Sequence, residues 1–227
     1  MSFKVCRFLF VGVMAFTLGG VVMEAQGATY GPYSSGTGLW LTIGPDEDED
    51  EPSVENTIIV TDNFFINNMS VTLDIGHSYV SDLMIELTGP NDKTIWFRIP
   101  EWQSGGPGNP NEFELGQGYT FTDNAAIYIP TDDIVGPPKW KIPGGEYLPN
   151  DPIGNFAYFF KDSNAYGNWT LRIWDIVGPD DEGTLDSWQL NFDGTPVPIP
   201  GAVWLLGAGL AGLAGFRRNF RSYTRRH

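Results

Sequence analysis

Two stretches of the chain alternate strictly between hydrophobic and polar residues. In Gly167–Asp175 the apolar face carries Trp169, Leu171 and Ile173, and in the stretch ending at Phe192 it carries Trp188, Leu190 and Phe192. A period of two places successive side chains on opposite faces of a strand, so both stretches are predicted to be half-buried antiparallel strands. The connecting segment Val177–Gly183 holds a proline and three acids between glycines, a composition typical of a turn with carboxylates at its tip.

The same kind of pattern recurs from residue 57 onward in short segments separated by turn residues. Glycine and proline together account for 45 of the 227 residues, and almost no stretch has apolar residues at helical spacing. The further predicted strands are Ile58–Thr61, Ser70–Ile75, Asp82–Thr88, Thr94–Ile99, Tyr119–Phe121 and Ala126–Ile129. These features predict one all-β domain over residues 53–194, a β-sandwich or a jelly roll, of roughly 140 residues, which is enough to bury a core.

Residues 1–28 have the charge order of a secretory signal peptide. Lys4 and Arg7 precede an apolar run from Phe8 to Val22, and small residues follow at Ala25–Gly27. The alternative is a buried N-terminal helix, but this order of charge, apolar run and small residues favours export. Because the only cysteine, Cys6, lies inside this segment, we expect neither disulfides nor thiol chemistry in the exported protein.

Residues 195–227 read as a second membrane-directed segment. Gly201–Phe216 is a run of 16 small and apolar residues, about 24 Å as a helix, and five arginines follow it, beginning with Arg217 and Arg218. A plain single-span transmembrane anchor would fit this pattern. The preceding motif Val197-Pro198-Ile199-Pro200 gives it a closer resemblance to the PEP-CTERM sorting signal, although the glutamate of that motif is absent. The resemblance implies processing by an exosortase-type enzyme, transient membrane anchoring, and a final location at the outer envelope, the cell surface or outside the cell.

Charge is concentrated between these two ends. Residues 28–200 contain 27 acidic and six basic side chains, a net charge of about −21 against −15 for the whole chain. This balance argues against nucleic-acid binding and favours divalent cations, basic partners or simple solubility. Residues 29–52 end in six consecutive acids, Asp46–Glu51, and are predicted to be a solvated flexible linker.

Three separated motifs resemble the P/Homo B domain of proprotein convertases. They are Gly76–Leu83 with Ile85-Glu86-Leu87 and Gly89-Pro90-Asn91; Phe121–Ala126; and Gly167–Phe192, with its alternating W-x-L-x-I-x-D and G-x-L-x-x-W-x-L patterns. The resemblance covers Ser53–Asp193 and departs from the family at Ser81, where glycine is usual, and in long insertions at Gln103–Leu115 and Thr131–Pro152. It implies a jelly-roll β-sandwich that normally follows a subtilisin-like catalytic domain and stabilises it.

The sequence carries no serine-protease or zinc-hydrolase motif; a pair of carboxylates for glycoside hydrolysis stays open, because the separation of two such groups is not readable from a sequence with 27 acids in its central part. His77 is the only histidine outside the C-terminal segment, it lies in a strand-entry motif of the family, and no Gly-x-Ser-x-Gly motif accompanies it. We therefore expect a structural histidine and a non-catalytic module. Its partner would be extracellular polysaccharide or an exported protease, and its role either binding or structural work, or regulation of a subtilisin-like serine endopeptidase.

Calcium is the cofactor that this composition favours. Hard cations take oxygen ligands from carboxylates on turns, and the candidate ligands are Asp82, Asp123, Asp175, Asp180 and Asp181, with Asp162 as a weaker member. The alternative, that these acids cap turns by accepting hydrogen bonds from backbone amides, fits equally well.

Tryptophan supplies a further alternative, a carbohydrate-binding module. Trp102 and Trp140 lie in Gly/Pro-rich loops, where their flat rings would stack on sugars. Anchoring of the loops by these large side chains is the competing interpretation.

Overall fold

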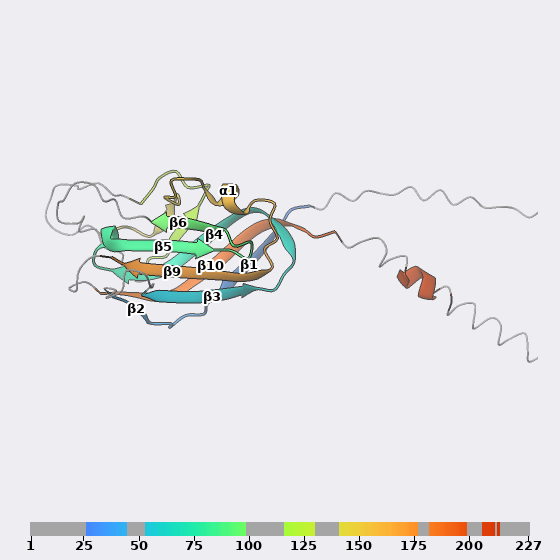
Figure 1. Ribbon diagram of the computed structural model, residues 1–227, viewed down its shortest axis with the longest axis horizontal. Helices are drawn as coiled ribbons and strands as arrows, with labels where there is room; N and C mark the ends of the chain where they lie inside the picture. Colours follow the sequence, from blue (N-terminus) through green and yellow to red (C-terminus); the bar gives the residue numbers. More distant parts are fainter. Residues whose placement is uncertain are drawn as a thin grey trace, which may run out of the picture.

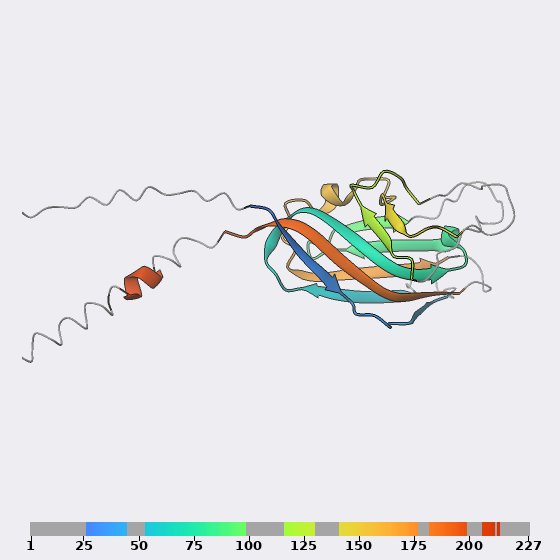
Figure 2. The same cartoon turned by 180° about the vertical axis from the view of Figure 1, so that it is seen from behind.

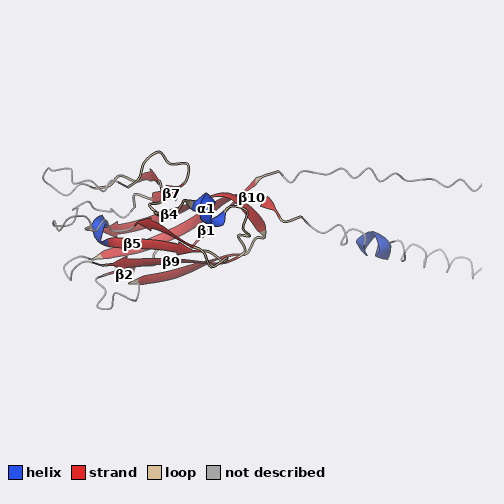
Figure 3. Ribbon diagram, turned by 45° about the horizontal axis from the view of Figure 1, so that its top comes forward, coloured by secondary structure: helices blue, strands red, loops and turns tan. Residues whose placement is uncertain are grey.

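The computed structural model of the chain describes residues 26–44, 53–98, 116–129, 141–176, 182–198, 206–211 and 213. Ten strands form two sheets that pack face to face (Figure 1). The strands are β1 Ala28–Ser34, β2 Leu41–Ile43, β3 Val54–Val60, β4 Phe64–His77, β5 Leu83–Thr88, β6 Thr94–Arg98, β7 Tyr119–Thr122, β8 Gly145–Tyr147, β9 Gly167–Asp175 and β10 Gly183–Pro196. Helical structure in this part of the chain includes the 3₁₀ turn η1 Val80–Asp82 and the short helix α1 Phe156–Phe160 (Figure 3).

Sheet A has the order β1-β10-β4-β7-β8, with β2 also paired to β10, and sheet B has the order β3-β9-β5-β6. All pairings are antiparallel except β7 with β8. Figure 2 shows β1, β10, β4 and β7 crossing the side of the molecule opposite to sheet B. The all-β sandwich predicted from the sequence is therefore confirmed.

The core lies between the two sheets and is built by the alternation that the sequence displays. On β9 every second residue from Trp169 to Asp175 is buried, and β10 buries Leu185, Trp188, Leu190 and Phe192. A bulge between Leu185 and Ser187 shifts the period of β10 by one residue, so that Trp188 still faces inward. Both predicted strands of this region are confirmed, with their faces as expected.

Two sequence predictions are corrected by the fold. Residues 29–52 were expected to form a linker, but β1 and β2 pair with β10 and join sheet A, because extended segments can hydrogen-bond to an open strand edge without a strong hydrophobic pattern of their own. The acidic run 46–51 lies outside the described residues. Ala126–Ile129 was expected to be a strand, but it forms only an isolated bridge between Tyr128 and Leu148.

The ends of the chain are described only in small part. The signal segment up to residue 25 lies outside the described residues, as does most of the run 201–216. Where the chain is described, no helix has the length and hydropathy needed to cross a membrane.

Candidate functional site

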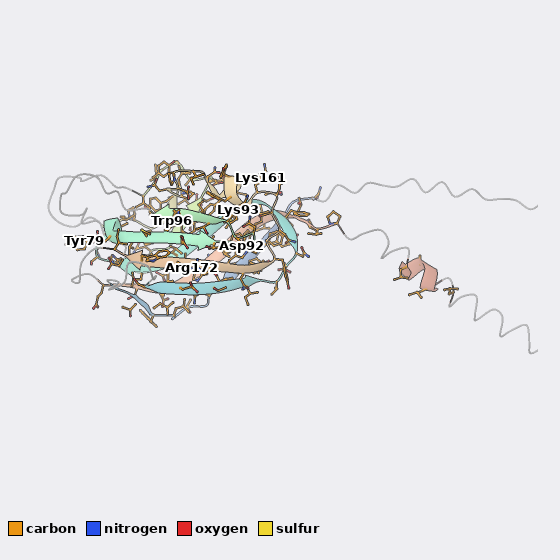
Figure 4. All side chains as sticks on the ribbon, viewed as in Figure 1. Tyr79, Asp92, Lys93, Trp96, Lys161 and Arg172 are labelled. Atoms are coloured by element: carbon orange, nitrogen blue, oxygen red, sulfur yellow. The ribbon has the colours of Figure 1, made fainter. Side chains whose placement is uncertain are left out.

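His77 and Asp175 meet at the end of the sandwich where β4 and β9 terminate. Nε2 of His77 lies 3.3 Å from Oδ2 of Asp175, and both side chains are completely buried. On the other side of the ring, Nδ1 accepts a hydrogen bond from the Tyr79 amide at 3.1 Å and lies 2.9 Å from the Tyr79 carbonyl oxygen. Figure 4 shows Tyr79 at this end of the molecule, away from Asp92 and Lys93. Both ring nitrogens of His77 are thus occupied by the fold.

The geometry of His77 matches a structural rather than a catalytic histidine. A general base must reach a proton on a bound substrate, and a ring with no exposed surface does not reach one in this conformation. Gly183 at the start of β10 packs against the same ring, since a Cβ at this position would collide with His77 and with the Gly76 carbonyl. The last family motif and the first therefore meet at this histidine.

Asp82 lies close to Asp175, directly before the start of β5. It closes η1, and its carbonyl oxygen accepts a hydrogen bond from the Ile176 amide at 2.9 Å, while the next residue, Leu83, pairs with Asp175. Asp82 is 4% exposed and Asp175 1%. Of the five predicted calcium ligands, these two lie near each other, Asp82 just before β5 and Asp175 at the end of β9. Asp180 and Asp181 lie outside the described residues.

Asp123 serves a different purpose. Its two carboxylate oxygens accept hydrogen bonds from the amides of Phe156 and Ala157, at 2.9 and 2.8 Å, at the start of α1. These amides have no partner within the helix, and Asn155 satisfies the next one, on Tyr158, at 3.0 Å. The structure thus gives Asp123 the backbone-capping role that was the alternative to calcium ligation. Asp162, the weaker candidate, is exposed in a turn after α1 with a φ of 61°.

Replacing Asp123 with alanine is expected to destabilise the domain by about 1–2 kcal/mol, because two amides at the start of α1 lose their acceptors. Chemical denaturation of the purified full chain measures the change. Asp123→Asn keeps one acceptor oxygen and should lose less. The loss should be the same with calcium and with EDTA; a loss seen only with calcium would make Asp123 a metal ligand instead.

The outer face of sheet B carries a charged row that crosses four strands. The register aligns Glu55 of β3, Arg172 of β9, Glu86 of β5 and Trp96 of β6. Nε of Arg172 donates to Glu55 at 2.7 Å and its Nη1 donates to Glu86 at 3.0 Å, and these two bonds raise the pKa of Arg172 above its ordinary value. Figure 4 shows Arg172 and Trp96 on this face. Because the Arg172 side chain is 31% exposed, these ion pairs add little to the stability of the fold. Their clearer effect is that the positive charge of Arg172 compensates the negative charge of the nearly buried Glu86.

The tryptophans that the structure describes lie in the core, on the outer face of sheet B or in an exposed loop. Trp169 and Trp188 are core residues, as predicted. On the outer face of sheet B, the ring centroids of Trp96 and Trp174 lie 5.7 Å apart. Trp40 is 66% exposed. The predicted sugar-stacking residues Trp102 and Trp140 lie outside the described residues. So do Ile199, Pro200, Arg217 and Arg218 of the sorting motif, whereas Val197 and Pro198 follow the end of β10.

Large apolar side chains are exposed around α1. Ile153 is 69% exposed, Tyr158 63% and Tyr166 58%, and Phe65 of β4, which bridges to Asn164, is 37% exposed. The ring of Tyr158 packs directly over Gly154. Large apolar side chains left exposed on and around one short helix are a candidate interaction surface. We call residues 153–166 together with Phe65 the α1 surface.

Sequence reasoning did not find the charged row on sheet B or the α1 surface. The row had a readable signal, since Arg172 and Glu86 both lie on the polar faces of predicted strands. Their adjacency depends on the strand order, which alternation alone does not fix. The α1 surface had no signal, because Phe156–Phe160 reads as a short apolar run in which buried and exposed positions look alike.

Comparison with known proteins gives one family match. The family model described as Proprotein convertase P-domain matches residues 153–192, which include α1, β9 and most of β10. No curated protein matches the chain.

Among solved structures, the serine protease of Aeromonas sobria is similar with a TM-score of 0.43 and 14% identity, covering 74% of this chain. The complex of that protease with the chaperone ORF2 is similar with a TM-score of 0.45 and 16% identity, covering 76%. The chain spans 27% and 28% of the length of these two proteins. Residues 153–192 thus match the proprotein convertase P-domain, and over this segment the family resemblance predicted from the sequence is confirmed.

Proposed function

We propose that this chain is a non-catalytic P-domain module that acts beside a serine-type endopeptidase of the subtilisin class. The observation that carries the proposal is the family match over residues 153–192. The matched segment supplies β9 and most of β10. Each of these strands has a neighbour on both sides in its sheet, so the match to the family covers the centre of the sandwich. One sheet has the strand order β1-β10-β4-β7 and the other has β3-β9-β5-β6, so the chain passes repeatedly from one sheet to the other. This is the connectivity of two Greek keys, and it supports the jelly-roll form of the proposed module.

The buried histidine supports a non-catalytic role. His77 is held between the Tyr79 backbone and Asp175, so its ring cannot approach a scissile bond without opening the end of the sandwich. A hydrolytic triad needs its base beside a nucleophile and open to substrate. The His–Asp pair of this protein is better suited to holding η1 and the end of β9 together.

The α1 surface supplies a place for the endopeptidase to dock. Its exposed residues Tyr158 and Tyr166 present ring faces together with hydroxyl groups, a combination enriched at protein interfaces. The whole segment 153–166 lies within the family match. Docking there would leave the outer face of sheet B available.

The test uses the full chain and an exported subtilisin-type protease from the same organism. We expect chemical cross-linking followed by mass spectrometry to join the protease to the α1 surface, and the full chain to lengthen the thermal half-life of the protease. The double variant Tyr158→Ser/Tyr166→Ser should lose both effects, while Ile59→Ser, at an equally exposed apolar position on β3, should keep them. Absence of any cross-link to such a protease would reject the proposal.

We further propose that the module is exported and sorted to the cell surface. The signal-like residues 1–28 and the sequence from Val197-Pro198-Ile199-Pro200 through the arginine cluster support this proposal. Mass spectrometry of the protein recovered from the cell surface should show new termini near residue 28 and near Pro200. An intact tail carrying Arg217 and Arg218 would reject processing by an exosortase-type enzyme.

Calcium binding is also proposed, at the end of the sandwich where Asp82 and Asp175 lie. The support for it is two buried carboxylates, one just before β5 and one at the end of β9, followed in the sequence by the acids at 180 and 181. Within the described ranges no three His, Cys, Asp or Glu side chains gather in one place, so Asp82 and Asp175 alone do not complete a site.

Millimolar calcium is therefore expected to raise the melting temperature of the full chain, and EDTA to lower it, because a ligand that binds only the folded state stabilises that state. Differential scanning calorimetry measures the shift. Asp180→Ala/Asp181→Ala should abolish it without changing the melt in EDTA. An unchanged melt in EDTA would reject structural calcium.

A further inference from the structure

The outer face of sheet A carries a grid of small polar side chains. The register aligns them in three rows across neighbouring strands, and Figure 2 shows this side of the molecule. The rows are Thr29–Asp193–Asn68, then Asn191–Ser70–Thr122, then Thr72–Thr120–Glu146. Neighbouring positions in a row are about 5 Å apart and successive rows about 7 Å apart, which are the spacings of a pleated sheet.

This face is hollowed rather than flat. A groove of about 190 Å³ opens over β1, β10, β4, β7 and β8, with Met69 and Phe192 among its lining residues. Ser70 and Asn191 lie in the middle row, and Asn124 and Glu146 contribute to the lining from the β7–β8 side. The volume is below the range of about 300–1,000 Å³ that is usual for drug-sized ligands, and it suits one or two small rings.

Several polar groups in the groove have spare hydrogen-bonding capacity. Among the described residues, the side chains of Asn68, Asn191 and Ser70 make no hydrogen bond, and the same holds for the side-chain amide of Asn124, whose backbone amide donates to the Thr122 hydroxyl. By contrast, the Thr29 hydroxyl donates to Asp193 at 3.2 Å, and the Thr72 and Thr120 hydroxyls bond to each other at 2.8 Å. Each free amide offers two donors and an acceptor side by side, so the groove can bond to adjacent hydroxyl groups of a ligand.

Charge restricts the class of ligand. The lining contains the two carboxylates of Glu146 and Asp193 and no lysine or arginine, so phosphate, sulfate and uronate groups would be repelled. Asp193 is already engaged by Thr29, and no three acids gather in the described residues, which argues against a divalent cation. Polar groups dominate the lining, so an apolar ligand would leave them without partners. Among these classes of ligand, an uncharged molecule rich in hydroxyl groups fits the groove best.

We propose that this groove binds an uncharged sugar, one or two hexopyranose units of a neutral oligosaccharide, with Asn68, Ser70 and Asn191 as its central contacts. Asn191 and Asn68 reach the ring hydroxyls from two neighbouring strands, and Glu146 accepts from a hydroxyl at the β8 edge. The proposal is independent of docking to an endopeptidase, because none of the lining residues belongs to the α1 surface. It also does not depend on Trp102 or Trp140.

The test titrates the full chain with cellohexaose, laminarihexaose, maltohexaose and mannohexaose, each up to about 10 mM, a range that detects even millimolar dissociation constants. We expect at least one of them to bind and to shift the side-chain amide resonances of Asn68 and Asn191 in ¹H–¹⁵N spectra. Asn191→Ala should weaken binding at least tenfold, and Ser70→Tyr should abolish it by filling the groove. Asn168→Ala, at an exposed position on β9 in the other sheet, should bind as the unmodified chain does.

Three outcomes would overturn the proposal: no binding of any of the four sugars, binding that Asn191→Ala leaves unchanged, or tighter binding of heparin or polygalacturonate at these same resonances. Near-ultraviolet circular dichroism establishes that each variant is folded. Should Ser70→Tyr fail to fold, Asn191→Ala still decides the result, because this substitution removes only an outward-facing side-chain amide.

Discussion

Replacing Trp169 with alanine is expected to destabilise the domain by about 3–5 kcal/mol. Trp169 is fully buried at the centre of sheet B, where its ring centroid lies 4.9 Å from that of Phe160 and 5.3 Å from that of Phe192. It therefore joins α1, β9 and β10 through one side chain. Its indole N–H also donates to the Ala165 carbonyl at 2.9 Å, and this carbonyl would lose its partner.

Urea denaturation of the full chain measures this loss, and two variants separate its causes. Trp169→Phe keeps a ring in the core but removes the N–H, so it should lose clearly less than Trp169→Ala. Trp40→Ala removes an equally large side chain that is 66% exposed and should change the free energy of unfolding by no more than about 0.5 kcal/mol. Equal losses at positions 40 and 169 would contradict the assignment of Trp169 to the core.

The central strands could be predicted because their sequence pattern is determined by burial. On β9 the inward positions Trp169, Leu171 and Ile173 are apolar because they fill the core, whereas the outward positions are free to be polar. Gly167–Asp175 therefore shows its period of two directly. The buried residues Val71, Leu73 and Ile75 on β4 made that strand readable for the same reason, although the structure extends it to Phe64–His77.

The edge of sheet A could not be predicted in this way. β1 has the sequence ATYGPYS and is largely exposed, so it carries no strong alternation and resembles a linker. It is held by backbone hydrogen bonds to β10, which any sequence without a badly placed proline can form. Its Tyr30 does stack on Phe64 with ring centroids 3.8 Å apart, but one aromatic residue is too little to mark a strand.

The candidate site was predicted only as far as residue types allow. Carboxylates at predicted strand ends identified Asp82 and Asp175, which the fold brings close together at the start of β5 and the end of β9, and a turn position identified Asp123. Residue type does not say whether an oxygen faces an amide or a cation. The groove on sheet A escaped prediction because outward-facing asparagine, serine and threonine are ordinary on strands; only the register shows that these residues converge.

Replacing Asp175 with alanine is expected to cost about 3–5 kcal/mol, the loss typical of breaking a buried pair and leaving one partner behind. His77 would keep its contact with Tyr79 but lose the acceptor at Nε2, in a place where no water reaches it. Because His77 ends β4 and Asp175 ends β9, the change should loosen the contact between the two sheets at this end.

Urea denaturation again gives the measurement, and an exposed pair provides the control. Glu55→Ala breaks an ion pair with Arg172 in which Glu55 is 55% exposed, and such pairs are worth less than about 1 kcal/mol. If His77 and Asp175 act as a unit, the double variant His77→Ala/Asp175→Ala should lose less stability than the sum of the two single variants. A loss at Asp175 no larger than that at Glu55, or losses that simply add, would show that the pair does not hold this end of the sandwich closed, and the structural reading of His77 would fail with it.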